Sequence, residues 1–223
     1  MSRYKKHQVL STIYNTGVIP VFYSQDASLC LDVIRACYAG GIRAFEFTNR
    51  GDFAHEAFSA LSRAVQLELD GMVLGVGSVI NPATADLYIQ LGADFVVSPG
   101  FVEETAKTCN RRMIPYSPGC GSVSEIVRAQ EYGVDLIKVF PGAQVGGPKF
   151  VEAVKGPMPW TMIMPTGGVE PTEANLGAWF KAGVCCVGMG SQLITKEILE
   201  QRDWAALSRL CTESLELVRR FRK

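Results

Sequence analysis

The strongest constraint on the fold is a short apolar segment that recurs eight times along the chain, each time followed by a longer segment with helical periodicity. The segments start about 18 to 30 residues apart and end near Gly, Pro, Ser or Thr. They cover residues 18–22, 44–48, 74–77, 95–98, 113–116, 136–139, 161–164 and 184–187. Because eight βα units in one domain favour a closed parallel barrel over an open sheet, the pattern predicts an α/β fold of the (β/α)8 TIM-barrel type.

The chain is expected to form one domain. Its 223 residues are 48% hydrophobic and 20% charged, which suits a globular protein with a large core. No shift in composition marks a linker, so residues 1–223 are interpreted as a single barrel with a helix before the first strand. Residues 194–199 and 203–221 are predicted to be closing helices, and Asp203 is placed to cap the second.

Composition argues against several classes of partner. Lysine plus arginine equals aspartate plus glutamate at 22 each, so no net positive field favours nucleic acid. No apolar stretch approaches the roughly 20 residues of a membrane span, and the first residues lack an apolar signal core, so no membrane association or export is expected. Seven cysteines without a C-x-x-C pair and two histidines favour reduced thiols in the cytoplasm and no metal site.

One lysine interrupts an apolar strand. Lys138 lies within the segment Leu-Ile-Lys-Val-Phe, directly before the glycine-containing loop that begins at Pro141. Burial disfavours an ammonium ion, and a lysine that loses its proton becomes a nucleophile toward carbonyl groups. The alternative is an exposed strand lysine, or one whose stem extends to water. The position at the carboxyl end of a barrel strand, where barrel enzymes carry their active sites, favours the nucleophile.

The second strand carries polar side chains on one face. Glu46, Thr48 and Arg50 alternate with two phenylalanines, so the phenylalanines are expected to face the helices and the polar groups the barrel interior. Glu46 would then lie near Lys138 and could transfer protons, while Arg50 could clamp a substrate carboxylate. A structural ion pair between Glu46 and Arg50 remains the alternative, because such pairs also form without catalysis.

Glycine loops follow the seventh and eighth strands, where barrel enzymes commonly bind phosphate. The candidate phosphate-binding residues are Gly167, Gly168, Gly190 and Ser191. A further glycine loop after the third strand is interpreted as a tight turn in which Ser78 is placed to help hold a substrate carboxylate. Residues 117–119 are expected to form a turn after the fifth strand and, second to that, a pocket wall.

These segments together resemble a known family. The matching stretches are GVIPVF (17–22), AGGIRAFEFTNR (39–50), GVGSVINP (75–82), GADFVVSPG (92–100), IPYSPGCGSVSE (114–125), IKVFPG (137–142), PTGGV (165–169) and VGMGSQL (187–193). They are similar to the class I aldolases that cleave 2-keto-3-deoxy-6-phosphogluconate (KDPG), a family that overlaps with 4-hydroxy-2-oxoglutarate (KHG) aldolases. The resemblance implies reversible cleavage of KDPG to pyruvate and glyceraldehyde 3-phosphate, with KHG cleavage to pyruvate and glyoxylate as a possible second activity.

The same resemblance implies roles for individual residues. Lys138 would be the Schiff-base lysine and Glu46 the proton-transferring carboxylate, and Arg50 and Ser78 would bind the pyruvate carboxylate. The glycine loops would hold the phosphate of a small phosphorylated 2-keto acid. No cofactor or metal would be needed, because the cationic iminium stabilises the developing charge. The resemblance also implies a homotrimer.

Three positions depart from the usual pattern of that family. The family commonly has threonine where Ser78 and Gly51 stand, and the loop 141–144 reads Pro-Gly-Ala-Gln where a more usual form carries an alanine and an acidic residue. These departures leave the 2-keto-3-deoxy-6-phosphogalactonate epimer open as a substrate. Two further hypotheses are a phosphosugar isomerase or epimerase, which would not form an imine, and a non-catalytic barrel that binds phosphorylated metabolites.

Overall fold

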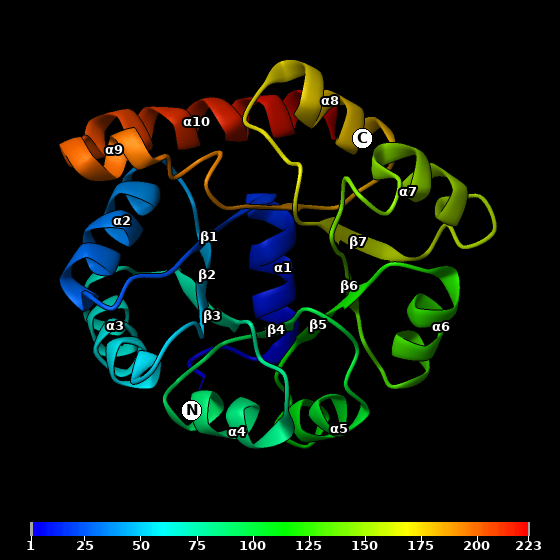
Figure 1. The fold of residues 1–223 in the computed structure, drawn as a ribbon, viewed down its shortest axis with the longest axis horizontal. Coiled ribbons are helices and arrows are strands. Elements are labelled where there is room, and N and C mark those ends of the chain that lie inside the picture. The colour runs from blue at the N-terminus through cyan, green and yellow to red at the C-terminus, as the bar shows by residue number, and fades with distance from the viewer. Residues whose placement is uncertain (1, 223) are drawn as a thin grey trace.

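The computed structural model describes residues 2–222, which contain eight parallel strands arranged in a barrel (Figure 1). The strands are β1 (Val18–Phe22), β2 (Ala44–Thr48), β3 (Val73–Gly77), β4 (Val96–Ser98), β5 (Tyr116–Cys120), β6 (Leu136–Val139), β7 (Met162–Pro165) and β8 (Val187–Met189). Each strand pairs with its sequence neighbour, β1 pairs with β8, and a parallel bridge between Thr166 and Gly188 joins the two remaining edges. The predicted TIM barrel is therefore confirmed.

Helices surround this barrel, and one of them covers one of its ends. They are α1 (Lys6–Thr16), α2 (Ala27–Ala39), α3 (Ala54–Glu68), α4 (Pro82–Gln90), α5 (Glu103–Arg111), α6 (Val123–Glu131), α7 (Gly147–Lys155), α8 (Glu173–Lys181), α9 (Lys196–Gln201) and α10 (Trp204–Phe221). Side-chain caps set several helix starts: Asp203, for example, accepts the backbone N–H of Ala206 at 2.8 Å, as its sequence position predicts. Within residues 2–222 no helix is both long enough and apolar enough to cross a membrane.

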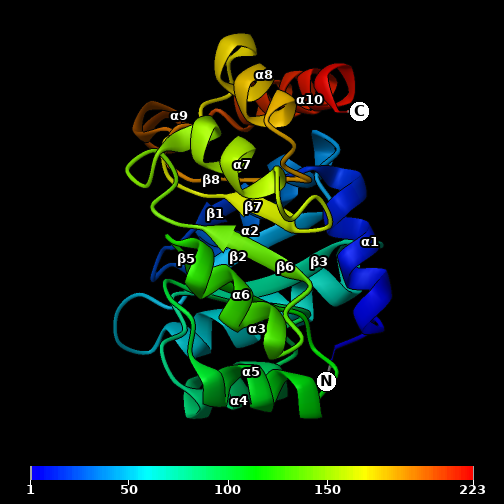
Figure 2. The ribbon, with the colours of Figure 1, turned by 90° about the vertical axis from the view of Figure 1, so that its right-hand side faces the viewer.

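Strand alternation divides the core into two layers. Outward-facing side chains such as Phe45, Phe47 and Ile137 pack against the ring of helices, while inward-facing ones such as Ala44 and Leu136 belong to a separate cluster inside the barrel. Helix α1 seals the bottom of that inner cluster, and it lies across the barrel axis in Figure 1 and along one side of the barrel in Figure 2. The opposite end, at the carboxyl ends of the strands, remains available for a site.

The predicted fifth strand is wrong in position. It was expected at residues 113–116 but spans Tyr116–Cys120, so Ser117, Pro118 and Gly119 lie in the strand and do not form a turn. Met113 is 66% exposed and has a left-handed backbone (φ 54°), which identifies a turn. Gly119 is needed inside the strand because a Cβ there would overlap the backbone carbonyl oxygen of Pro99.

Two C-terminal elements are also shifted relative to the sequence prediction. The eighth strand was expected at residues 184–187 but spans Val187–Met189, because the apolar run marks the buried approach to the strand and not the ladder itself. The helix expected at residues 194–199 begins and ends two residues later, since the hydroxyl of Thr195 accepts the N–H of Ile198 and caps it.

Candidate active site

A buried pair of opposite charges lies inside the barrel. Lys138 of β6 places its Nζ 3.9 Å from Oε1 of Glu46 on β2, and the two side chains are only 8% and 1% exposed. Strand alternation explains the placement, because their neighbours Phe45, Phe47 and Ile137 face the helices. The Lys138 ammonium nitrogen also lies 5.0 Å from the centroid of the Phe140 ring. The predicted approach of Lys138 and Glu46 is present in the structure.

Burial changes the acidity of Glu46. Desolvation raises the pKa of this carboxyl group above its ordinary value, and the positive charges of Lys138 and Arg50 partly oppose that increase. Its second oxygen, Oε2, is buried without a hydrogen-bond partner among the described residues. A carboxyl group with a raised pKa and a free acceptor oxygen is suited to take and return a proton.

Gly77 provides the space that Glu46 occupies. The two residues lie on paired strands, and a Cβ at Gly77 would overlap Oε1 of Glu46. Gly75 and Gly77 belong to β3, within the strand predicted at residues 74–77, and Ser78 follows that strand directly. We conclude that Gly77 positions the carboxylate by having no side chain, a role that depends on a contact between strands and has no local sequence signal.

Arg50 and Ser78 lie together at the top of neighbouring strands. The Nε of Arg50 donates to Oγ of Ser78 at 3.4 Å, and Ser78 has a left-handed backbone (φ 60°) that turns its hydroxyl toward the arginine. Both side chains retain polar groups for a further ligand, since a guanidinium has five N–H donors. The structure thus brings together the two residues predicted to hold a carboxylate.

A pocket of about 580 Å³ opens at the carboxyl ends of the strands, above the buried pair. Its lining contains Arg50 and all four of the predicted phosphate-binding residues: Gly167, Gly168, Gly190 and Ser191. Thr48 and Phe140 also line it, each two residues after a member of the buried pair. Lys138 and Glu46 therefore lie one layer of side chains below the pocket floor.

The loop after β7 presents backbone to this pocket. Gly167 and Gly168 have left-handed φ angles of 94° and 75°, and a Cβ at Gly168 would overlap the side chain of Ala143. Consecutive glycines in this conformation leave their N–H groups accessible to an anion. The arrangement fits a phosphate site in the position where barrel enzymes commonly have one.

Several pocket residues were missed by the sequence analysis, and three of them carry hydroxyl or amine groups. Thr166 precedes the two glycines, and its hydroxyl is buried without a hydrogen-bond partner among the described residues, so it is available to a ligand. Its place in the PTGGV segment was a usable signal. Lys196, at the start of α9, and Tyr23, after β1, also line the pocket but carry no comparable local motif. Among residues 2–222 no cluster of His, Cys, Asp and Glu side chains is arranged to hold a metal ion.

Comparison with known proteins identifies the family of this chain. The family model described as KDPG and KHG aldolase matches residues 9–210. The chain belongs to the KDPG and KHG aldolase family. Its membership confirms the family suggested by the eight sequence segments, and it argues against the isomerase and the non-catalytic barrel as alternatives.

Individual relatives extend over nearly the same length as this chain. The KHG/KDPG aldolase of Escherichia coli K12 is 33% identical over 206 residues, 92% of this chain and 94% of the relative. The 2-dehydro-3-deoxy-phosphogluconate aldolase of Pseudomonas aeruginosa is 34% identical over 200 residues, 89% of this chain and 88% of the relative. The crystal structure of the Legionella pneumophila KDPG aldolase, with pyruvate captured as a covalent carbinolamine, has a TM-score of 0.82 and 29% identity, covering 92% of this chain and 96% of that one. The expected class I Schiff-base aldolase is confirmed.

Proposed function

We propose that this aldolase reversibly cleaves KDPG to pyruvate and glyceraldehyde 3-phosphate, with Lys138 as the Schiff-base lysine. The observation that carries the proposal is the Lys138–Glu46 pair, 3.9 Å apart and almost fully buried beneath a pocket lined by an arginine and two glycine loops. The curated relatives described above, which are named for KDPG and KHG, support this choice of substrate.

Bond cleavage begins at the lysine. Lys138 gives up its ammonium proton, and its neutral amine attacks C2 of the 2-keto acid to form a carbinolamine. The hydroxyl group of the carbinolamine takes up a proton and leaves as water, which gives an iminium ion. The iminium nitrogen then accepts the electron pair of the breaking C3–C4 bond. Because this cation supplies the stabilisation that a Lewis acid gives elsewhere, the step uses no metal or other cofactor.

Glu46 moves the proton in both halves of the reaction. Its carboxylate takes the proton of the C4 hydroxyl, directly or through a water, as the C3–C4 bond breaks and the aldehyde leaves. It then returns the proton to C3 of the enamine, and hydrolysis of the resulting iminium releases pyruvate and Lys138. The raised pKa of the buried Glu46 carboxyl suits a group that must hold the proton between these steps.

The remaining pocket residues orient the substrate. Arg50 and Ser78, which lie within hydrogen-bond reach of each other, would bind the carboxylate next to the keto group. The loops carrying Gly167, Gly168, Gly190 and Ser191 would bind the phosphate through backbone N–H groups and a hydroxyl. Holding both ends of the substrate places C2 over Lys138 and the C4 hydroxyl near Glu46.

A substrate comparison tests the proposal. The rate of pyruvate release should be measured with KDPG, its galactonate epimer and KHG, and kcat/KM compared. We expect KDPG to be preferred over KHG, because KHG lacks the phosphate that the glycine loops would bind. KHG cleavage is the second candidate activity, supported by the name of the Escherichia coli relative. Cleavage of none of the three would contradict the proposal.

Two further properties are proposed, one from the family resemblance and one from the cysteines. The first is a homotrimer, which light scattering would detect as three times the 24.3 kDa mass of one chain. The second is a cytoplasmic location, which the seven free cysteines support, since such thiols persist in a reducing compartment.

A further inference from the structure

Two pockets meet at one tyrosine. Next to the substrate pocket of about 580 Å³ lies a side pocket of about 380 Å³. The side pocket is lined by Tyr23, Gln25, Ala27, Asp52, Phe53, Ala54, Glu56 and Ala57. Of the residues described, Tyr23 alone borders both pockets. The Tyr23 side chain therefore forms part of the wall between the two pockets.

The other half of the wall is the backbone at Gly51. Arg50 lines the substrate pocket and Asp52 lines the side pocket, so the intervening glycine lies between the two spaces. A Cβ at Gly51 would come within 2.7 Å of the Tyr23 hydroxyl oxygen, which shows that the tyrosine already fills the place of a side chain. The Tyr23 ring meets Phe47 edge to face, with centroids 5.6 Å apart.

Packing holds this wall in place, without a hydrogen bond. The Tyr23 hydroxyl is buried and has no hydrogen-bond partner among the described residues. Gly51 has a left-handed φ of 93°, which a residue with a side chain adopts only with strain. The hydroxyl oxygen is the Tyr23 atom nearest the place of a Gly51 side chain, and the ring behind it supplies most of the volume of the wall.

The two pockets also differ in charge. The side pocket carries the carboxylates of Asp52 and Glu56, and among residues 2–222 no lysine or arginine lines it. The substrate pocket carries Arg50 and Lys196 together with the glycine loops. A phosphate would be repelled from the side pocket, whereas a neutral polyhydroxylated chain could hydrogen-bond to its carboxylates.

We propose that Tyr23 is a specificity-determining residue that, with Gly51, closes the substrate pocket toward the side pocket and so limits the length of the aldehyde this aldolase accepts. The inference rests on the proposed function, because it concerns the aldehyde half of the same reaction. A short aldehyde fits beside the glycine loops, and a longer unphosphorylated one is excluded by the tyrosine ring.

The test uses aldol synthesis from pyruvate with glyceraldehyde, ribose or ribose 5-phosphate as the acceptor. In Tyr23→Ala, kcat/KM for ribose relative to glyceraldehyde should rise about tenfold, because the side pocket becomes reachable. The gain should be smaller for ribose 5-phosphate, which would bring an anion toward Asp52 and Glu56. Tyr23→Phe is the matched control, and its ribose-to-glyceraldehyde ratio should stay within about twofold of wild type, since the ring is kept.

A second pair of variants changes Gly51, the residue that Tyr23 packs against. Gly51→Ala should displace the tyrosine and raise the ribose ratio, whereas the double variant Tyr23→Phe with Gly51→Ala should restore it, because without the hydroxyl the nearest ring atom, Cζ, lies 3.5 Å from the new Cβ. This pair keeps the proposal testable if Tyr23→Ala is too unstable to assay.

Two outcomes would overturn the assignment. An unchanged ribose ratio in Tyr23→Ala would show that the ring does not limit length, and an equal rise in Tyr23→Phe would assign the effect to the hydroxyl. Reduction with borohydride in the presence of pyruvate distinguishes failure of the Tyr23 assignment from failure of the proposed aldolase function. If wild type forms no pyruvate adduct, the aldolase mechanism is wrong; if Tyr23→Ala forms the adduct but keeps its ratio, only the wall is wrong.

Discussion

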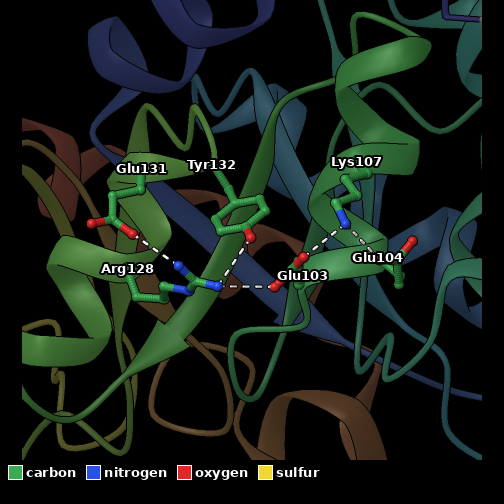
Figure 3. Close-up of polar contacts among 6 residues, drawn as sticks. All are labelled: Glu103, Glu104, Lys107, Arg128, Glu131 and Tyr132. Atoms are coloured by element: carbon green, nitrogen blue, oxygen red, sulfur yellow. Dashed lines mark hydrogen bonds and ion pairs between the residues drawn. The ribbon is translucent and has the colours of Figure 1, made fainter.

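Two groups of charged residues differ in their exposure, in the length of their contacts and in the acidity of their carboxyl groups. On the outer surface, helices α5 and α6 share a network in which Lys107 contacts Glu103 at 2.7 Å, and Arg128 contacts Glu103 at 3.1 Å and Glu131 at 3.0 Å (Figure 3). Inside the barrel, Nζ of Lys138 lies 3.9 Å from Oε1 of Glu46. The surface network has shorter and more numerous contacts, yet the buried pair is where we place the chemistry.

The acidities of Glu103 and Glu46 explain why we place the chemistry at the buried pair. Hydrogen bonding from Lys107, and then from Tyr132, lowers the pKa of the Glu103 carboxyl, whereas burial raises that of Glu46. A carboxylate with satisfied hydrogen bonds in water is stable and inert, and exposed pairs of this kind add little to folding. A buried carboxyl with an oxygen that lacks a partner among residues 2–222 can exchange its proton with a substrate. Burial and an oxygen without a hydrogen-bond partner among the described residues therefore distinguish the pair to which we assign the chemistry from the surface network.

The largest effect should come from removing the buried amine. Lys138→Ala should lower kcat by at least about 10⁴-fold, because no other described amine lies beside Glu46 beneath the pocket. The measurement is single-turnover cleavage of KDPG, with circular dichroism to show that the barrel remains folded. Substantial turnover in a folded variant would place the reactive amine elsewhere.

The next effect concerns the buried carboxylate. Glu46→Gln should lower kcat about 10²- to 10⁴-fold while leaving imine formation with pyruvate intact, because the amide cannot accept the proton. The acid limb of the wild-type pH–rate profile should lie above the roughly 4.3 of an ordinary glutamate, in the direction of the raised pKa, and should vanish in the variant. Equal loss of imine formation and of turnover would contradict this division of roles.

The same variant gives a stability test with a defined sign. Because the pKa of Glu46 is raised in the folded state, folding favours the protonated form of this side chain. The stability that the protonated form contributes is fully present below the unfolded pKa of about 4.3 and is lost as pH rises through the folded pKa. The melting temperature of Glu46→Gln relative to wild type should therefore increase between pH 4 and pH 8. Thermal denaturation across that range measures it, and a falling difference would contradict the raised pKa.

A smaller effect is expected from crowding the carboxylate. Gly77→Ala should lower kcat about tenfold to a hundredfold, because the added methyl group overlaps Glu46 Oε1 and shifts it. Gly100→Ala is the matched control, since a Cβ there meets no atom of the described residues within 4 Å. Shortening the acid in Glu46→Asp with Gly77→Ala should recover part of the loss relative to Glu46→Asp alone. No coupling in this double-mutant cycle would show that Gly77 does not position the carboxylate.

The smallest effect should come from the surface network. Arg128→Ala removes the contacts to Glu103 and Glu131 but should change kcat/KM less than about twofold and lower the melting temperature by at most about 3 °C. The loss should shrink in high salt, because exposed charges are screened. A change in activity comparable to that of Gly77→Ala would mean that exposure does not separate the two groups.

The sequence predicted the buried pair because its signal is local. Alternation along β2 and β6 was enough to turn Glu46 and Lys138 inward, and the glycine loops after β7 and β8 lie where barrels bind phosphate. The fifth strand was misplaced because Pro118 and Gly119 are ordinarily turn residues, and only the close backbone of Pro99 explains a glycine within the strand.

Contacts between distant segments could not be predicted in this way. The role of Gly77 depends on a side chain that β2 brings against β3, and the wall at Tyr23 depends on two loops that meet at Gly51. Neither arrangement has a periodicity or a motif, since each is set by how strands and loops are packed side by side. The reaction class was therefore accessible from sequence, whereas the packing of Glu46 against Gly77 and of Tyr23 against Gly51 required the structure.

The most direct test of the account is reductive trapping of pyruvate with sodium borohydride, followed by peptide mass spectrometry. We predict one covalent adduct, on Lys138, in wild type and in Glu46→Gln, and none in Lys138→Ala. Aldol cleavage without any adduct, or an adduct on another pocket lysine such as Lys196, would contradict the claim that the buried Lys138–Glu46 pair is the catalytic centre.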